Sequence, residues 1–142
     1  MSITILGQVP ELTEAHTFPL YMSPVKAGFP SPADDFLEGM IDLNKHLIKH
    51  PAATYLIRVS GESMINAGIG HDDILVVDTT LKPKHRDIVI ACLDGEMTVK
   101  RFYQTPKTTA LIPENDAFEP IMIRDGMDFS IWGVVKHVIK SL

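Results

Sequence analysis

Ser63 and Lys100 are the two residues of this 142-residue sequence whose types could together carry out a reaction. Ser63 lies in the run VSGESM at 59–64, and Lys100 lies in the run TVKR at 98–101. A serine hydroxyl is a poor nucleophile until a neighbouring base removes its proton. A lysine amine can be that base when its surroundings keep it neutral. The pair therefore predicts attack on a carbonyl carbon, provided that the fold gathers both side chains and buries the lysine.

Ser63 follows a predicted strand and stands two residues after Gly61. This spacing is typical of a tight turn that presents a hydroxyl together with backbone N–H groups. The N–H groups of Glu62 and Ser63 are then candidates for an oxyanion hole. The same spacing also fits ordinary turn serines, whose hydroxyls bond to nearby backbone. Spacing alone leaves both interpretations open.

Lys100 shares one face of a predicted strand with Thr98 and Phe102, because side chains alternate along a strand. Partial desolvation beside Phe102 would lower the pKa of the lysine. At a reference pKa of about 10.4, roughly one lysine in 2,500 is neutral at pH 7, and lowering the pKa to ~7 costs ~4.6 kcal/mol. The alternative is a lysine at a sheet edge with its ammonium in water. The spacing is compatible with either.

The composition is that of an ordinary globular chain, with 45% apolar and 22% charged residues. The net charge of −5 and the lack of a Lys/Arg cluster argue against direct, sequence-specific DNA binding. The single cysteine, Cys92, excludes an internal disulfide. The six histidines lack the spacing of a metal site, so neither a metal nor a cofactor is expected. A secretory signal and a membrane span are not apparent, which makes the cytoplasm the expected location.

Residues 1–32 are expected to form an extended, loosely attached N-terminal arm, because prolines at 10, 19, 24, 30 and 32 interrupt any regular pattern. The remaining residues, 33–142, are expected to form one domain. A short helix is predicted near 42–49, where Pro51 stops it. The pair Asp72 and Asp73 is expected to lie in a solvated turn.

From Thr54 onward, short runs of apolar and β-branched residues predict strands. Asp94-Gly95 between two such runs is a strong hairpin signal. Several strands without intervening helices indicate a mainly antiparallel sheet or small barrel. The strands are expected at 55–59, 74–77, 87–93, 96–103, 110–112, 120–123 and 131–139.

Several separated motifs, in this order, resemble the LexA and phage-repressor group of Ser-Lys self-cleaving proteins. The motifs are AGFPSPA at 27–33, SGESM at 60–64, DIVI at 87–90, GE and TVKR at 95–101, LIP with Asn115, and GVV at 133–135. Together they favour the catalytic interpretation of the serine and the lysine. The resemblance also implies that the fold is a small, strongly curved sheet like the C-terminal domain of LexA.

The resemblance implies a role for each matching position. Ser63 is the expected nucleophile and Lys100 its general base. The backbone N–H groups of Glu62 and Ser63 are the expected oxyanion donors, and Ala27-Gly28 is the expected scissile bond. Only 27 residues precede that bond, too few for the DNA-binding domain of the repressors.

Within this group, the chain resembles the accessory subunits of error-prone translesion DNA polymerases. That resemblance implies a homodimer, a recombinase filament on single-stranded DNA as activator, and a Y-family polymerase as partner of the cut form. Two alternatives stay open. The chain could be a non-catalytic module that binds polymerase or recombinase with an idle site. It could also cut other proteins as signal peptidases do, although no membrane anchor is expected.

Overall fold

The computed structural model of this protein describes residues 1–12, 14–21 and 37–142. They fall into two compact units. The larger unit contains Met1–Pro10 with His50–Leu142, and the smaller unit contains Glu11–Lys49. The expected boundary between arm and domain, at residues 32 and 33, lies outside the described residues and stays a prediction.

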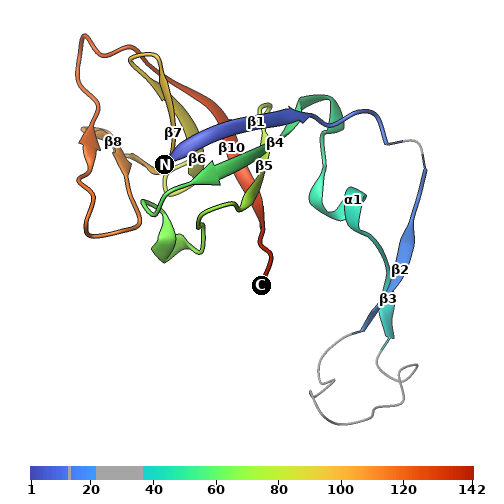
Figure 1. The fold of residues 1–142 in the computed structure, drawn as a ribbon. Helices are drawn as coiled ribbons and strands as arrows, with labels where there is room; N and C mark the ends of the chain where they lie inside the picture. Colours follow the sequence, from blue (N-terminus) through green and yellow to red (C-terminus); the bar gives the residue numbers. More distant parts are fainter. Residues whose placement is uncertain (13, 22–36) are drawn as a thin grey trace. The chain divides into compact units, whose positions relative to one another are not determined.

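An eight-stranded antiparallel sheet makes up most of the larger unit and confirms the predicted mainly β fold. The strand order is β1-β4-β5-β10-β6-β7-β8-β9, and the sheet curls strongly in Figure 1. Two 3-10 helices, Pro51–Ala53 and Ile65–Ala67, precede and follow β4. The strands are β1 Ser2–Gln8, β4 Thr54–Ser60, β5 Ile74–Asp78, β6 Ile88–Leu93, β7 Glu96–Gln104, β8 Thr109–Ile112, β9 Ile121–Met122 and β10 Phe129–Ile139.

The β6–β7 hairpin forms where the Asp-Gly signal predicted it. Asp94 and Gly95 have φ angles of 48° and 84°. Positive φ at both central residues gives a turn whose twist matches that of the flanking strands. Val89 consequently lies opposite Lys100, and Ile90 lies opposite Val99. The turn therefore fixes the position of Lys100 in the sheet.

Two apolar clusters stabilise the curled sheet. The first contains Met64, from the turn after β4, together with Val99 of β7. The second contains Phe102, which lies two residues after Lys100 on the same face of β7. The remaining buried members are Ile57, Val59, Ile69, Leu75, Val77 and Ile90 in the first cluster and Val89, Ala91, Leu111 and Val134 in the second. Both predicted catalytic residues thus have a chain neighbour in the core.

Strand β1 was not predicted, since the segment was expected to be loosely attached. It pairs with β4 in antiparallel register from Ser2 opposite Ser60 to Gln8 opposite Tyr55. It also contacts β7. Met1 and Ile3 pack against the first apolar cluster, which accounts for the docking of the strand. The first residues of the chain therefore lie close to the two strands that lead to Ser63 and carry Lys100 (Figure 1).

The smaller unit pairs β2 (Thr17–Tyr21) with β3 (Leu37–Asp42) in antiparallel register. Helix α1 (Leu43–Leu47) follows, with the Asp42 carboxylate as N-cap acceptor for the Lys45 N–H. The predicted short helix is thereby confirmed. Phe18, Leu20 and Met40 are exposed, and the unit has no apolar core of its own among its described residues.

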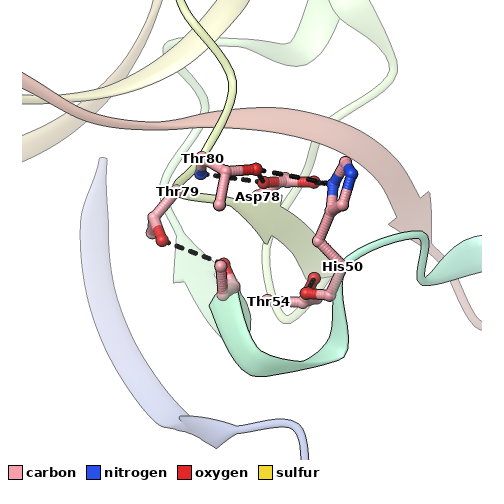
Figure 2. A network of polar contacts seen from close by, with 6 residues as sticks. His50, Thr54, Asp78, Thr79 and Thr80 are labelled. Carbon is pink, nitrogen blue, oxygen red and sulfur yellow. Dashed lines mark hydrogen bonds and ion pairs between the residues drawn. The ribbon is translucent and has the colours of Figure 1, made fainter.

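A network of polar contacts fastens the residues before β4 to the end of β5 (Figure 2). The buried Asp78 carboxylate accepts hydrogen bonds from the Thr80 N–H and hydroxyl and forms an ion pair with His50. The Thr54 and Thr79 hydroxyls donate to the carbonyls of His50 and Ala53. Burial alone would raise the pKa of Asp78, but the Thr80 and His50 hydrogen bonds hold it below the usual value.

Candidate active site

Ser63 lies in the turn that leaves β4. Gly61 has a φ of 103°, a left-handed value that glycine adopts without strain. Met64 is fully buried, and its carbonyl accepts the N–H groups of Ala67 and Ile69. The turn is thus anchored directly after Ser63, whose side chain is pulled beneath the surface.

The Ser63 hydroxyl is buried without a partner. Its residue is 1% exposed, and within the described ranges Oγ has no hydrogen bond. A buried unpaired hydroxyl costs about 1–3 kcal/mol, so such groups are rare in purely structural positions. The alternative interpretation, a turn serine bonded to nearby backbone, is therefore not what the described residues show. The hydroxyl is therefore not held by a hydrogen bond within the described residues.

Lys100 is buried in the middle of β7 and is 7% exposed. Its Nζ donates to Thr98 Oγ1 at 2.7 Å and to the Val99 carbonyl at 3.2 Å. Both acceptors are neutral, and in the described part of the chain no carboxylate forms an ion pair with this lysine. Burial therefore lowers the pKa of Lys100 below its usual value. The lysine is therefore desolvated, and it is not a sheet-edge lysine with its ammonium in water.

Met1 lies close to the turn that carries Ser63 and interacts with the charge of Lys100. Its Cα would stand 3.3 Å from a Cβ built on Gly61, two residues before Ser63. The Met1 ammonium has a lowered pKa, first because of burial and second because of the Lys100 charge. Ser63 and Lys100 are not hydrogen-bonded to each other among the described residues. Met1 thus lies near the turn that carries Ser63 and near enough to Lys100 for the two charges to interact, and the pairing of the serine with the lysine stays a prediction.

The predicted oxyanion donors lie on the peptide between Glu62 and Ser63 and on the one before it. The Glu62 carbonyl accepts two hydrogen bonds, from the Ile65 N–H at 3.2 Å and from Asn115 Nδ2 at 2.9 Å. In the part of the chain that the structure describes, the Ser63 N–H makes no backbone hydrogen bond in this turn. A buried N–H beside the predicted nucleophile is the type of donor that an oxyanion hole uses.

The predicted scissile bond, Ala27-Gly28, lies outside the described residues. Its position relative to Ser63 stays a prediction.

Three contacts of this region were not predicted from the sequence. Thr98 holds Lys100 Nζ, a contact that the shared strand face could have indicated. Asn115 reaches Glu62 across 53 residues of sequence, although it stood in one of the motifs noted above. Asp73 is 4% exposed and accepts from Lys140 Nζ and the Gly70 N–H, so the expectation of a solvated turn is wrong for it.

The physical reason for this correction is the chain reversal at Asp72. That residue is exposed and has a φ of 65°, which turns the next side chain inward. Burial alone would raise the pKa of Asp73, but the Lys140 and Gly70 hydrogen bonds and the Lys140 charge lower it below the usual value. This carboxylate is therefore ionised and paired at neutral pH.

Over residues 1–12, 14–21 and 37–142, no three His, Cys, Asp or Glu side chains gather as metal ligands would. A search of the same residues for a helix of sufficient length and hydropathy to cross a membrane finds none.

Comparisons with known proteins identify a family and several relatives that are similar to this chain. A model of the Peptidase S24-like family matches residues 19–136. Protein ImpA of Salmonella typhimurium is 47% identical over 130 residues, spanning 92% of this chain and 88% of ImpA. Protein MucA of Escherichia coli is 41% identical over 126 residues, spanning 88% and 86%. LexA repressor 1 of Geobacter sulfurreducens is 39% identical over 119 residues, which are 83% of this chain and 58% of the repressor.

Proposed function

Because the chain belongs to the Peptidase S24-like family and is a UmuD-type member of it, we propose that it is an SOS-response protein that cuts its own Ala27-Gly28 bond. Ser63 is the nucleophile and Lys100 the general base of this proposal. The serine-peptidase type of activity follows from the family. The dyad and the cut are the finer statements that the proposal adds.

The proposed reaction has two steps. Neutral Lys100 Nζ takes the proton of Ser63 Oγ, which attacks the Ala27 carbonyl carbon. The resulting oxyanion is stabilised by the N–H groups of Glu62 and Ser63, and its collapse breaks the Ala27–Gly28 C–N bond as Lys100 returns the proton to the Gly28 amine. Water, deprotonated by Lys100, then hydrolyses the ester and releases residues 1–27 as a free acid.

The proposal is carried by the burial of Lys100 among neutral acceptors and by the buried, unpaired hydroxyl of Ser63. The chain neighbours of the two residues, Val99 and Met64, belong to the same apolar cluster. A lysine with an ordinary pKa is almost entirely protonated at neutral pH and cannot act as a base. Desolvation without a carboxylate partner lowers the pKa of Lys100. The same low-dielectric surroundings strengthen any hydrogen bond that the site donates to the oxyanion. No other lysine of the described residues is buried in this way.

The cut form is proposed to act as an accessory subunit of an error-prone Y-family DNA polymerase in SOS mutagenesis. The proposed assembly is a homodimer, and the proposed activator is a recombinase filament on single-stranded DNA. Direct sequence-specific DNA binding is not part of the proposal, since the net charge is −5.

The test is incubation of the purified full chain over pH 7–11, with intact mass measured over time. One cut after Ala27 is expected, with a rate that rises about tenfold per pH unit and levels off below pH ~10.4, because the folded pKa of Lys100 is lowered. Ser63→Ala and Lys100→Ala should abolish the cut. Their matched controls are Ser130→Ala and Lys84→Ala, which change exposed residues. Equal cutting by Lys100→Ala and the wild type would remove the lysine from the mechanism.

The alternative of an idle site is favoured by one observation, the missing hydrogen bond between Ser63 and Lys100 among the described residues. The discriminating experiment adds a recombinase filament assembled on single-stranded DNA. A cut after Ala27 in the wild type but not in Ser63→Ala supports the protease. An intact chain under both conditions, together with binding to the filament, supports the module.

A further inference from the structure

We infer that Asn115 is a positioning residue for the self-cleavage reaction: it orients the Glu62–Ser63 peptide so that the Ser63 N–H points toward the developing oxyanion. This inference rests on the function proposed above and assigns a role to a side chain outside the proposed dyad. Asn115 acts through the backbone of the serine turn.

Both polar atoms of the Asn115 side-chain amide form hydrogen bonds. Nδ2 donates to the Glu62 carbonyl at 2.9 Å, and Oδ1 accepts the Ala117 N–H at 3.0 Å. The second bond closes a turn within the loop itself and fixes which end of the amide faces Glu62. The Glu62 carbonyl therefore receives a donor that its own loop holds in place.

A trans peptide unit is planar, and its carbonyl oxygen and its N–H hydrogen lie in that plane on opposite sides of the C–N bond. Asn115 and the Ile65 N–H hold the Glu62 oxygen on one side of this bond. The Ser63 N–H, which belongs to the same plane, must then point to the other side. Rotation of this peptide would turn a donor away from the oxyanion and bring a carbonyl oxygen toward it. Fixing the carbonyl is thus a way of fixing the oxyanion donor.

The loop that carries Asn115 is itself fastened to both catalytic elements. The Asn66 N–H, in the helix after Ser63, donates to the Glu114 carbonyl at 2.8 Å. Arg101 Nε donates to the Glu114 carboxylate at 2.8 Å, and Arg101 directly follows Lys100 in β7. The loop therefore ties the serine turn to the strand of the lysine. Asn115 is the side chain of this loop that reaches the reacting peptide.

The test compares Asn115→Asp, Asn115→Ala and Asn66→Asp for self-cleavage across pH in the full chain. Asn115→Asp keeps an oxygen for Ala117 but places an acceptor against the Glu62 carbonyl. Asn66 lies in the same turn with an exposed side chain, so Asn66→Asp adds the same charge without touching that carbonyl. We expect the maximum rate to fall about 10- to 100-fold in Asn115→Asp and Asn115→Ala and to stay near wild type in Asn66→Asp.

A second readout separates positioning from simple support of the fold. In Asn115→Ala the pH midpoint of the rate should stay at the wild-type value, because the surroundings of Lys100 are unchanged. The Tm of Asn115→Asp should stay within about 2 °C of that of Asn66→Asp. Wild-type cutting by Asn115→Asp, or a rate loss that follows a loss of Tm, overturns the inference while leaving the proposed function intact. Cutting by Ser63→Ala instead removes the proposed function, and the inference falls with it.

Discussion

Two pairs of buried polar residues in the larger unit have opposite hydrogen-bonding surroundings. Asp73 and Asp78 are each 4% exposed and are surrounded by donors that stabilise their charged forms. Ser63 and Lys100 are also buried, at 1% and 7% exposed, but the hydroxyl has no partner in the described residues and the lysine donates only to neutral acceptors. The aspartates stabilise the fold at neutral pH. The serine and the lysine cost stability there, which is typical of groups kept for a reaction.

The largest effect on stability is expected for Asp78→Ala. The substitution leaves the Thr80 N–H and hydroxyl without their acceptor and removes the His50 ion pair. We expect the free energy of unfolding to fall by about 3 kcal/mol. Urea unfolding at pH 7 measures it, with the exposed Asp125→Ala as matched control at about 0.5 kcal/mol or less. Equal losses in the two variants would contradict the structural role of Asp78.

Acid is expected to remove the contribution of both aspartates. Their folded pKa values lie below the usual value, so their stabilisation is complete above pH ~4 and is lost as the pH falls through the folded values. The Tm of the wild type should therefore fall as the pH drops below about 4. The Tm of Asp78→Asn should depend less on pH in this acid range, since one of the two carboxylates no longer titrates. An identical slope would show that Asp78 contributes nothing to acid stability.

The contribution of Lys100 to stability should have the opposite sign to that of the aspartates. Its folded pKa is lowered, so the unfolded chain binds more protons than the folded chain at pH values between the folded pKa and ~10.4. Lys100→Met is therefore expected to raise the Tm at pH 7, by about 3 °C for each kcal/mol of relieved desolvation. The gain should shrink as the pH approaches 10. Lys84→Met, at an exposed lysine, should show neither the gain nor its pH dependence.

The smallest loss of stability is expected for Ser63→Ala, because the lost hydroxyl has no described partner to leave unpaired. The free energy of unfolding should stay the same or rise, by no more than the ~1–3 kcal/mol that a buried unpaired hydroxyl costs. Thr54 provides the matched comparison, since it is also 1% exposed but donates to the His50 carbonyl at 2.7 Å. Thr54→Val should lower the free energy of unfolding by about 1 kcal/mol. A larger loss for Ser63→Ala than for Thr54→Val would mean that the serine has a structural partner.

The sequence predicted the seven strands from β4 to β10 because their apolar residues and turn residues are local signals. It did not predict β1, whose pairing depends on a partner strand more than 45 residues away. It also missed β2 and β3, where Pro19 and Gly39 argue against a strand although both fit a two-stranded ribbon.

The same difference between local signals and long-range contacts applies to the candidate site. Residue types and order indicated Ser63 and Lys100, and strand alternation indicated the face that Lys100 shares with Phe102. The burial of Asp73 depends on Lys140, 67 residues later, and the orientation of the serine turn depends on Asn115. Such contacts are set by the closure of the sheet, which short-range patterns do not contain.

Strand β1 lies upstream of the proposed cut, and this has a consequence for the cut protein. While the chain is intact, the linker holds β1 beside β4 at an effective concentration on the order of millimolar. After cleavage between Ala27 and Gly28, the same strand would be a separate peptide, diluted to the concentration of the protein itself. The strand is mostly exposed and is docked through few apolar side chains, chiefly Met1, Ile3 and Val9, so we expect it to leave at that dilution. Cleavage would thus turn a folded edge into an open row of backbone donors and acceptors along β4.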